Sequence, residues 1–294
     1  MSIPMAYVSV IVIWSTTPIA IKWSGEGGGY LFGLTARMVI GALLCFVVMG
    51  LFRLEMPWHK RALHSYLAGG CSLYGAMLAV YWGAQFIPSG MISVIYGLTP
   101  IVVSVMAAVW LGERCLTVSK VLGMLLGLLG LTVIFGSGVS LGGQAMLGIG
   151  AIVASVLIHA ASSIFMKRIA HDLPAMAMVS GGALVAVALY LPTWFVLDGT
   201  LPSAVSERAV YSIVYLGVFG SVVGFVLYYY MLKRLAATTM ALITLITPVS
   251  ALMLGKLLNS EVISVSVWMG TACILLGLVA HQLGDRVLAK NYSV

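Results

Sequence analysis

Long apolar runs, separated by short polar stretches, make up most of the 294-residue chain. A helix needs about 20 apolar residues to span the hydrocarbon core of a bilayer. Breaking the chain at charged residues, proline, glycine and asparagine yields runs of about this length. The pattern predicts an all-α integral membrane protein with ten transmembrane helices, at residues 3–22, 30–52, 64–85, 89–111, 119–136, 146–166, 174–197, 209–232, 236–257 and 264–283.

The composition supports a membrane location. Hydrophobic residues make up 62% of the chain, charged residues only 8%, and the mean hydropathy is +1.11. Soluble domains are about 25% charged, so this chain has too few charges to cover a water-exposed surface. The net charge of +7 would suggest nucleic acid in a soluble protein. Here we expect the lipid bilayer and a small-molecule substrate as partners, and no nucleic acid.

Basic residues are distributed unevenly between the two sets of loops. One set, with the C-terminal tail, carries most of the 15 lysines and arginines, whereas the other carries only Lys22, Arg208 and Lys256. Because lysine and arginine collect in cytoplasmic loops, this bias predicts that both termini are cytoplasmic. The first run lacks a basic leader, so we interpret it as a retained span and not as a signal peptide.

A Thr-Pro pair followed by a glutamate occurs twice. Glu113 follows Pro100 by thirteen residues, and Glu261 follows Pro248 by the same distance. Aromatic residues upstream of each pair also align. The repeat predicts two five-helix units, at residues 1–140 and 141–294. Because five is odd, the second unit is expected to enter the membrane from the opposite side.

Such inverted repeats are typical of secondary transporters, whose sites lie near the bilayer midplane between the units. The motifs Trp14-Ser15 … Lys22, Arg37 in the second run, Thr99-Pro100 … Glu113 and the glycine-rich fifth run, with their second copies, resemble the EamA family of the drug/metabolite transporter superfamily. The resemblance implies a ten-helix exporter in a bacterial inner membrane that moves amino acids, other metabolites or toxic organic compounds. His159 stands where the first unit has Trp14, so the resemblance transfers no tryptophan role to it.

The two prolines are expected to kink the helices that contain them, because proline removes a backbone hydrogen bond. One interpretation is that Pro100 and Pro248 bend their helices towards a central cavity and serve gating. The alternative is a static kink that improves packing. Thr99 and Thr247 are available to bond the freed backbone groups.

The two glutamates that end the repeated motif are expected to be structural. Each lies in the turn before the next predicted helix, where a carboxylate meets the positive end of the helix dipole. We therefore interpret Glu113 and Glu261 as caps of the helices that follow them, and a proton site as the alternative.

Ionisable residues at membrane depth are candidates for function. His159, near the centre of the sixth run, is a candidate for substrate contact or proton coupling, with a neutral, hydrogen-bonded histidine as the alternative. Arg37, inside the second run, either extends to the surface, is paired structurally, or attracts an anionic group such as an amino-acid carboxylate.

Aromatic and hydroxyl residues deep in the runs predict a cavity for a partly apolar solute. The alternative for each aromatic residue is the interfacial belt. The candidate substrate-binding residues are Trp14, Thr17, Tyr74, Tyr81, Tyr96, His159, Ser163 and Tyr229.

These features favour a secondary exporter that works by alternating access. Aromatic or neutral amino acids are the first substrate class, and organic cations or drugs, moved by proton-coupled efflux, are the second. Dispersed acids and histidines give no constellation for a membrane enzyme acting on lipid-linked substrates, and a receptor would need a larger soluble loop. Dispersed cysteines indicate no metal site, and we expect no cofactor. Glycines of the fifth and tenth runs predict close helix packing, in a monomer or possible homodimer.

Overall fold

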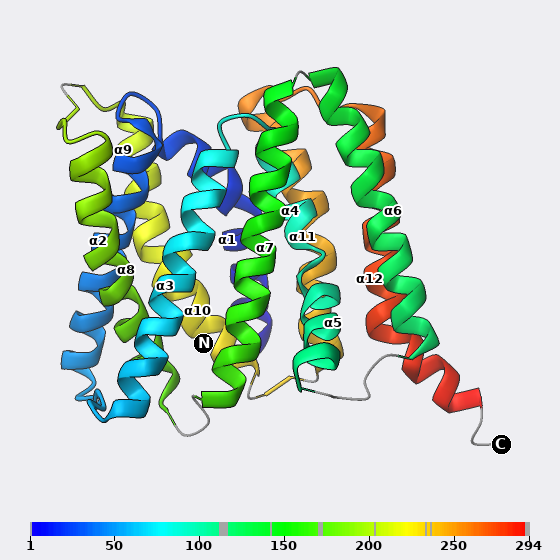
Figure 1. Ribbon diagram of the computed structural model, residues 1–294, viewed down its shortest axis with the longest axis horizontal. Helices are drawn as coiled ribbons and strands as arrows, with labels where there is room; N and C mark the ends of the chain where they lie inside the picture. The colour runs from blue at the N-terminus through cyan, green and yellow to red at the C-terminus, as the bar shows by residue number, and fades with distance from the viewer. Residues whose placement is uncertain are drawn as a thin grey trace.

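The structure is a computed structural model, which describes residues 2–111, 117–141, 143–169, 173–202, 204–232, 234–235 and 237–291. These residues are helical or in short connections, and none of them lies in a strand. Glu113 lies outside the described residues. The helices, labelled in Figure 1, are α1 (Ile3–Ser24), α2 (Gly29–Leu51), α3 (Lys60–Gly83), α4 (Ser89–Tyr96), α5 (Thr99–Leu111), α6 (Val118–Leu141), α7 (Gly143–Ile169), α8 (Ala175–Leu197), α9 (Glu207–Tyr215), the π-helix η1 (Leu216–Val223), α10 (Gly224–Leu232), α11 (Ala237–Asn259) and α12 (Val265–Asn291).

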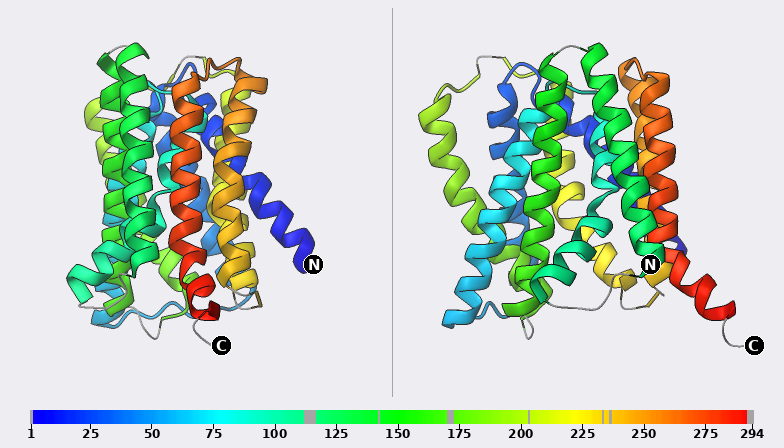
Figure 2. Two further views of the ribbon diagram at one scale, coloured as in Figure 1. Left: turned by 90° about the vertical axis from the view of Figure 1, so that its right-hand side faces the viewer. Right: turned by 45° about the vertical axis from the view of Figure 1, so that its right-hand side comes forward.

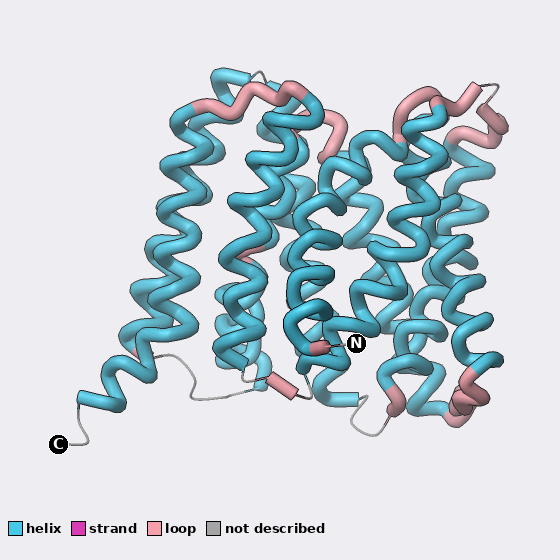
Figure 3. Tube along the Cα trace, turned by 180° about the vertical axis from the view of Figure 1, so that it is seen from behind, coloured by secondary structure: helices cyan, strands magenta, loops and turns pink. Residues whose placement is uncertain are grey.

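Among the described residues, seven helical segments are long and apolar enough to cross a membrane, and two shorter apolar helices lie at Ile243–Asn259 and Val265–His281. Two of the seven are composite, because α4 continues into α5, and α9 continues through η1 into α10. The described chain is thus an all-helical, multi-pass membrane protein. The helices lie side by side and their connections gather at the two ends of the bundle (Figure 3).

The bundle has two flanks and a centre. Helices α6 and α12 form one flank, and α2, α8 and α9 lie towards the other (Figure 1). Helix α3 packs against α7 and α8, and α1 and α4 both pack against α11 between the flanks. Both chain ends lie towards the lower end of the bundle, as the turned views also show (Figure 2).

The two prolines of the repeat lie in different local structures. The span predicted over 89–111 is confirmed as one apolar segment, Ser89–Trp110. It is interrupted by a two-residue turn at Gly97, because α4 ends at Tyr96 and α5 begins at Thr99. Pro100 therefore lies in the first turn of α5, where its missing N–H needs no partner. Pro248 lies inside the continuous helix α11.

The turn at Gly97 and the proline of α11 are neighbours. A Cβ atom added at Gly97 would come 3.8 Å from Cγ of Pro248. The expectation that Thr99 bonds a freed backbone group is wrong for the described residues, since its buried Oγ1 has no hydrogen-bond partner among them. The two Thr-Pro motifs therefore lie close together in the bundle. In the first unit the helix is interrupted beside the motif, whereas in the second unit the helix is continuous.

Helices α6 and α12 pack closely, as their glycines predict. A Cβ at Gly123 would come 2.5 Å from the carbonyl oxygen of Gly277, and one at Gly130 equally close to that of Gly270. Side chains larger than hydrogen would push these backbones apart. The glycine pattern is thus explained by one helix pair within the chain.

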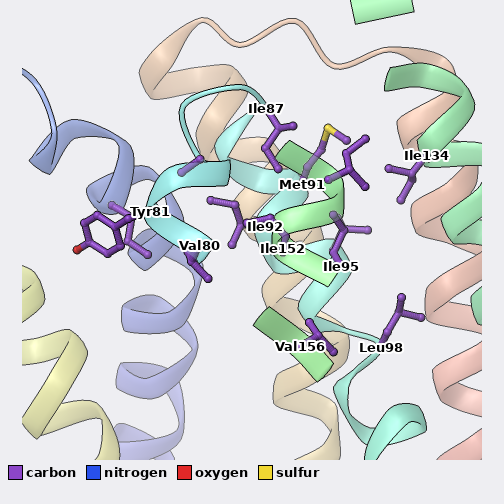
Figure 4. Packing of buried hydrophobic residues seen from close by; sticks show 14 of the residues in the cluster. Val80, Tyr81, Ile87, Met91, Ile92, Ile95, Leu98, Ile134, Ile152 and Val156 are labelled. Carbon is purple, nitrogen blue, oxygen red and sulfur yellow. The ribbon is translucent and has the colours of Figure 1, made fainter. Parts of the chain in front are cut away.

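The main buried core lies in the middle of the bundle. Its members come from α2, α3, α4, α7 and neighbouring helices, and include Ile95, Ile152 and Leu98. Figure 4 shows these aliphatic side chains gathered together, with the ring of Tyr81 set apart from them and directed away. The apolar core therefore borders a second, polar region on the Tyr81 side.

Candidate functional site

Side-chain hydrogen bonds inside the bundle join the two predicted units. Each pairs a residue before position 140 with one after it, so each depends on how the units sit against one another. The hydroxyl–hydroxyl distances are 2.6 Å for Thr16–Tyr215, 2.8 Å for Tyr74–Thr193 and 2.6 Å for Tyr96–Ser155, and Nε of Arg37 lies 3.3 Å from Oγ of Ser221.

Arg37 makes one of these contacts between the units. Its side chain is only 5% exposed, so the interpretation that it extends to the surface is wrong. Its Nη1 donates to the hydroxyl of Tyr81 on α3 at 3.3 Å, and its Nε donates to Ser221 on η1. The guanidinium carbon also lies 6.0 Å from the Tyr81 ring centroid. One side chain therefore contacts both predicted units.

Close packing between α2 and η1 brings Ser221 to Arg37. A Cβ at Gly41 would come 3.1 Å from that of Ser221, and one at Gly217 would come 3.2 Å from the carbonyl oxygen of Arg37. The Ser221 hydroxyl donates to the carbonyl of Leu216 at 3.0 Å, five residues back, in the register of a π-helix. Such π segments occur frequently at functional sites.

Two more tyrosines lie on the α3–α8 side of Arg37. The Tyr190 ring lies 4.9 Å from that of Tyr74, and its hydroxyl donates to the carbonyls of Leu73 and Tyr74 at 3.0 and 2.8 Å. Tyr190 is fully buried. These contacts of Tyr190 join α3 and α8.

His159 and Ser163 lie one turn apart on α7. Ser163 is exposed, and its hydroxyl donates to the carbonyl of His159 at 2.9 Å. The His159 ring is also exposed and lies 6.4 Å from that of Tyr96. The alternative of a hydrogen-bonded histidine is not seen within the described part of the chain. No group of three potential metal ligands is found there either.

The other predicted site residues lie on the α1 side. The Trp14 ring lies 5.2 Å from Tyr228 on α10. The Thr17 hydroxyl donates to the carbonyl of Ile13 at 2.7 Å, and a Cβ at Gly220 would lie 3.8 Å from it. Thr17 is thus near Arg37, whereas Trp14 is in a separate aromatic contact. The side chain of Tyr229 is outside the described set.

A second polar cluster lies at the upper end of the bundle and is built around Glu261. This carboxylate accepts from the backbone N–H of Ser89 at 2.8 Å and from its hydroxyl at 3.0 Å. Lys22 lies 3.5 Å from it and donates to the carbonyl of Ile87. Glu261 therefore caps α4. The prediction that it caps the following helix is wrong, because Ser264 caps α12.

Further contacts extend this upper cluster across the surface. Asn259 donates to Glu261 at 2.9 Å and accepts from the indole of Trp23 at 3.0 Å. Arg208 lies over that indole, 5.2 Å from a ring centroid, and donates to both oxygens of Glu26, at 2.9 and 2.7 Å. We call these residues, with Lys22, Ser89 and Glu261, the upper clasp. It joins the two predicted units at one end.

Several of these residues did not stand out in the sequence. Ser221, Thr193, Ser155 and Tyr190 are single polar residues within apolar runs, and each makes a contact described above. A hydroxyl group at membrane depth is a usable signal, because it needs a partner there. Choosing among many such hydroxyls, however, requires knowing which helices meet.

Comparison with known proteins identifies the class of this helical bundle. The chain belongs to the EamA-like transporter family, whose model matches residues 2–136 and again residues 146–280. The two matched segments fall on either side of the predicted boundary at 140, and together cover most of the chain.

Individual relatives agree with this family. An uncharacterized transporter of Bacillus subtilis, YoaV, is 25% identical over 93% of this chain and 94% of its own. A probable terminal-alkyne amino-acid exporter of Streptantibioticus cattleyicolor is 25% identical over 95% and 89%. A probable amino-acid metabolite efflux pump of Escherichia coli is 26% identical over 94% and 93%. One crystal structure, 22% identical, has the same fold with a TM-score of 0.67, covering 97% of this chain and 98% of its own.

Proposed function

We propose that this chain is a secondary transporter that exports small metabolites, amino acids or related compounds first among them, across a bacterial inner membrane. The family supports transport, and two relatives that are named as a probable amino-acid exporter and a probable amino-acid metabolite efflux pump support the substrate class. The observation that carries the proposal is the set of interior hydrogen bonds between the units, because transporters of this type hold their substrate where two repeats meet.

The proposed topology has ten membrane crossings in two inverted five-helix units, 1–140 and 141–294. Both chain ends lie at the lower end in Figure 1, which supports a shared side for the termini. The excess of lysine and arginine in the corresponding loops supports the cytoplasm as that side. The upper clasp then faces away from the cytoplasm.

The proposed mechanism is alternating access between the units. Opening towards the outside requires the contacts of the upper clasp to separate, including the Lys22–Glu261 ion pair at 3.5 Å. The interior hydroxyl contacts are exchangeable, since a solute hydroxyl, amine or carboxylate can replace either partner. Thr17, Tyr74, Tyr81 and Tyr96 are the predicted site residues that this proposal places beside the solute.

Flux measurements test the proposal. The purified protein is reconstituted in liposomes preloaded with radiolabelled amino acids or organic cations. These liposomes should release an amino acid saturably, and faster than equally loaded liposomes without protein. An imposed pH gradient separates a proton-coupled exporter from a facilitator, and His159→Ala tests whether the histidine contributes to that coupling. Release of organic cations alone would contradict the amino-acid assignment, and release of neither class would contradict the transport proposal for these solutes.

A further inference from the structure

We infer that Arg37 is the residue that binds a carboxylate group of the transported solute. This inference rests on the proposed function and deepens it by naming the group that the site recognises. It requires that the guanidinium be buried, lack an internal acidic partner, and keep donors free for a ligand.

Burial makes the charge of Arg37 expensive to maintain. The residue lies eight positions after the start of α2 at Gly29, which is about 12 Å along the helix axis, and it is 5% exposed. A buried ion is destabilising unless a partner of opposite charge offsets the lost hydration. Within the described residues the ion pairs are Lys22–Glu261 and Arg208–Glu26, so none includes Arg37.

The hydrogen bonds that Arg37 makes do not use its full capacity. A guanidinium carries five N–H donors in a fixed fork. Both described acceptors are neutral hydroxyls at 3.3 Å, which is longer than the usual N–H···O distance of about 2.9–3.0 Å. Nη2 has no described hydrogen-bond acceptor, and a Cβ added at Gly220 on η1 would come 3.4 Å from it. A carboxylate is the group whose two oxygens match such a fork.

The surroundings favour a monocarboxylate over other anions. One guanidinium compensates one negative charge, so a phosphate dianion would carry an uncompensated charge into an apolar interior. Tyr81 presents its ring to the guanidinium, whose carbon lies 6.0 Å from the ring centroid. This phenol offers an apolar face to the body of an organic acid. A purely cationic solute is disfavoured by like-charge repulsion.

Arg37 is also placed to sense the relative position of the two units. It bonds Tyr81 of the first unit and Ser221 of the second. Separation of the units breaks the Ser221 contact and frees an additional donor. The solute carboxylate can then replace the hydroxyls as the partner of the guanidinium. In this conformation Arg37 is buried and still bonded to the hydroxyls, which corresponds to the state before the solute carboxylate replaces them.

Ligand binding tests this without depending on transport. Purified full-length protein in detergent is unfolded thermally with benzoate, with the uncharged isostere benzamide, and with L-phenylalanine beside L-phenylalaninamide. The carboxylates should raise the unfolding temperature and the amides should not. Arg37→Gln should weaken benzoate binding roughly thirtyfold or more. Arg37→Lys keeps the charge without the fork and should weaken it less. Arg53→Gln, at an exposed loop position, is the matched control and should bind as the unmodified protein does.

Three results would overturn the inference: equal stabilisation of the unmodified protein by benzoate and benzamide, undiminished benzoate binding in a folded Arg37→Gln variant, or equal stabilisation by chloride or inorganic phosphate. The first and third need no variant, so they hold even if Arg37→Gln fails to fold. Amino-acid flux without carboxylate preference would contradict this inference and leave the proposed function intact. Carboxylate binding without flux would do the reverse.

Discussion

The part-exposed Lys22 and the buried Arg37 are cations with partners of different kinds. Lys22 in the upper clasp, 30% exposed, has a carboxylate partner, Glu261, whose side chain is 5% exposed and which also caps α4. Among the described residues, the hydrogen-bond partners of Arg37 in the interior are the hydroxyls of Tyr81 and Ser221. The first arrangement satisfies its charges internally and holds the units together, whereas the second leaves a charge whose natural partner is a ligand.

The largest effect on stability is expected from Glu261→Gln. This change leaves Lys22 without a counter-ion and weakens the cap on α4, so the free energy of unfolding should fall by about 2–3 kcal/mol. Thermal unfolding in one detergent measures the change. Glu55→Gln is the control, because Glu55 is exposed and such substitutions stay within about 0.5 kcal/mol. Equal behaviour of the two variants would show that the upper clasp does not stabilise the fold.

An interior hydroxyl contact should contribute less. Tyr96→Phe removes the 2.6 Å contact with Ser155, whose own hydroxyl retains its bond to the carbonyl of Ala76 at 2.7 Å. We expect a loss of about 1 kcal/mol, measured as above. Tyr211→Phe, at a position 72% exposed, should change little. A loss as large as that of Glu261→Gln would remove the energetic distinction between the two regions.

Much of the fold could be predicted from the sequence, because membrane helices are specified by local apolar length. Each of the ten predicted runs overlaps helix in the structure, and the glycine pairs of α6 and α12 meet as their spacing suggests. The position of the break at Gly97 was not predicted from the sequence. Local rules alone allow either a kink or a break at Pro100.

The residue types of the candidate site could be predicted from the sequence, but the contacts between those residues could not. Residue type and depth indicated Arg37, Tyr74, Tyr81 and Tyr96, and each of these side chains makes a hydrogen bond inside the bundle. Whether they bind a solute stays a prediction. Glu261 shows why sequence neighbours alone are not sufficient. The helix that begins nearest to it in the sequence is α12, but the helix whose N-terminus it hydrogen-bonds is α4. Which helix ends meet is decided by tertiary packing.

A smaller effect is expected from the exposed part of the upper clasp. Arg208→Gln removes the paired contacts with Glu26, but the two side chains are 53% and 33% exposed. Exposed pairs contribute about 0.2–1 kcal/mol and are weakened by salt. The destabilisation should therefore be near 0.5 kcal/mol and decline when the salt concentration is raised, whereas that of Glu261→Gln should persist. A salt-independent loss above about 2 kcal/mol would show that Arg208 is as important as the buried pair.

The smallest effect on stability is expected at Arg37, where the contrast between the two regions is sharpest. Arg37→Gln removes a desolvated charge that has no described ionic partner, and glutamine retains a donor for Tyr81 or Ser221. The free energy of unfolding without ligand should change by less than about 0.5 kcal/mol, in either direction, since the lost hydrogen bonds are offset by the removed desolvation cost. The same thermal assay measures it beside Glu261→Gln. A loss of about 3 kcal/mol or more, as when one partner of a buried ion pair is removed, would mean that Arg37 already has a strong internal partner. In that case the interior cation would be structural, like Lys22, and the two regions would differ only in position.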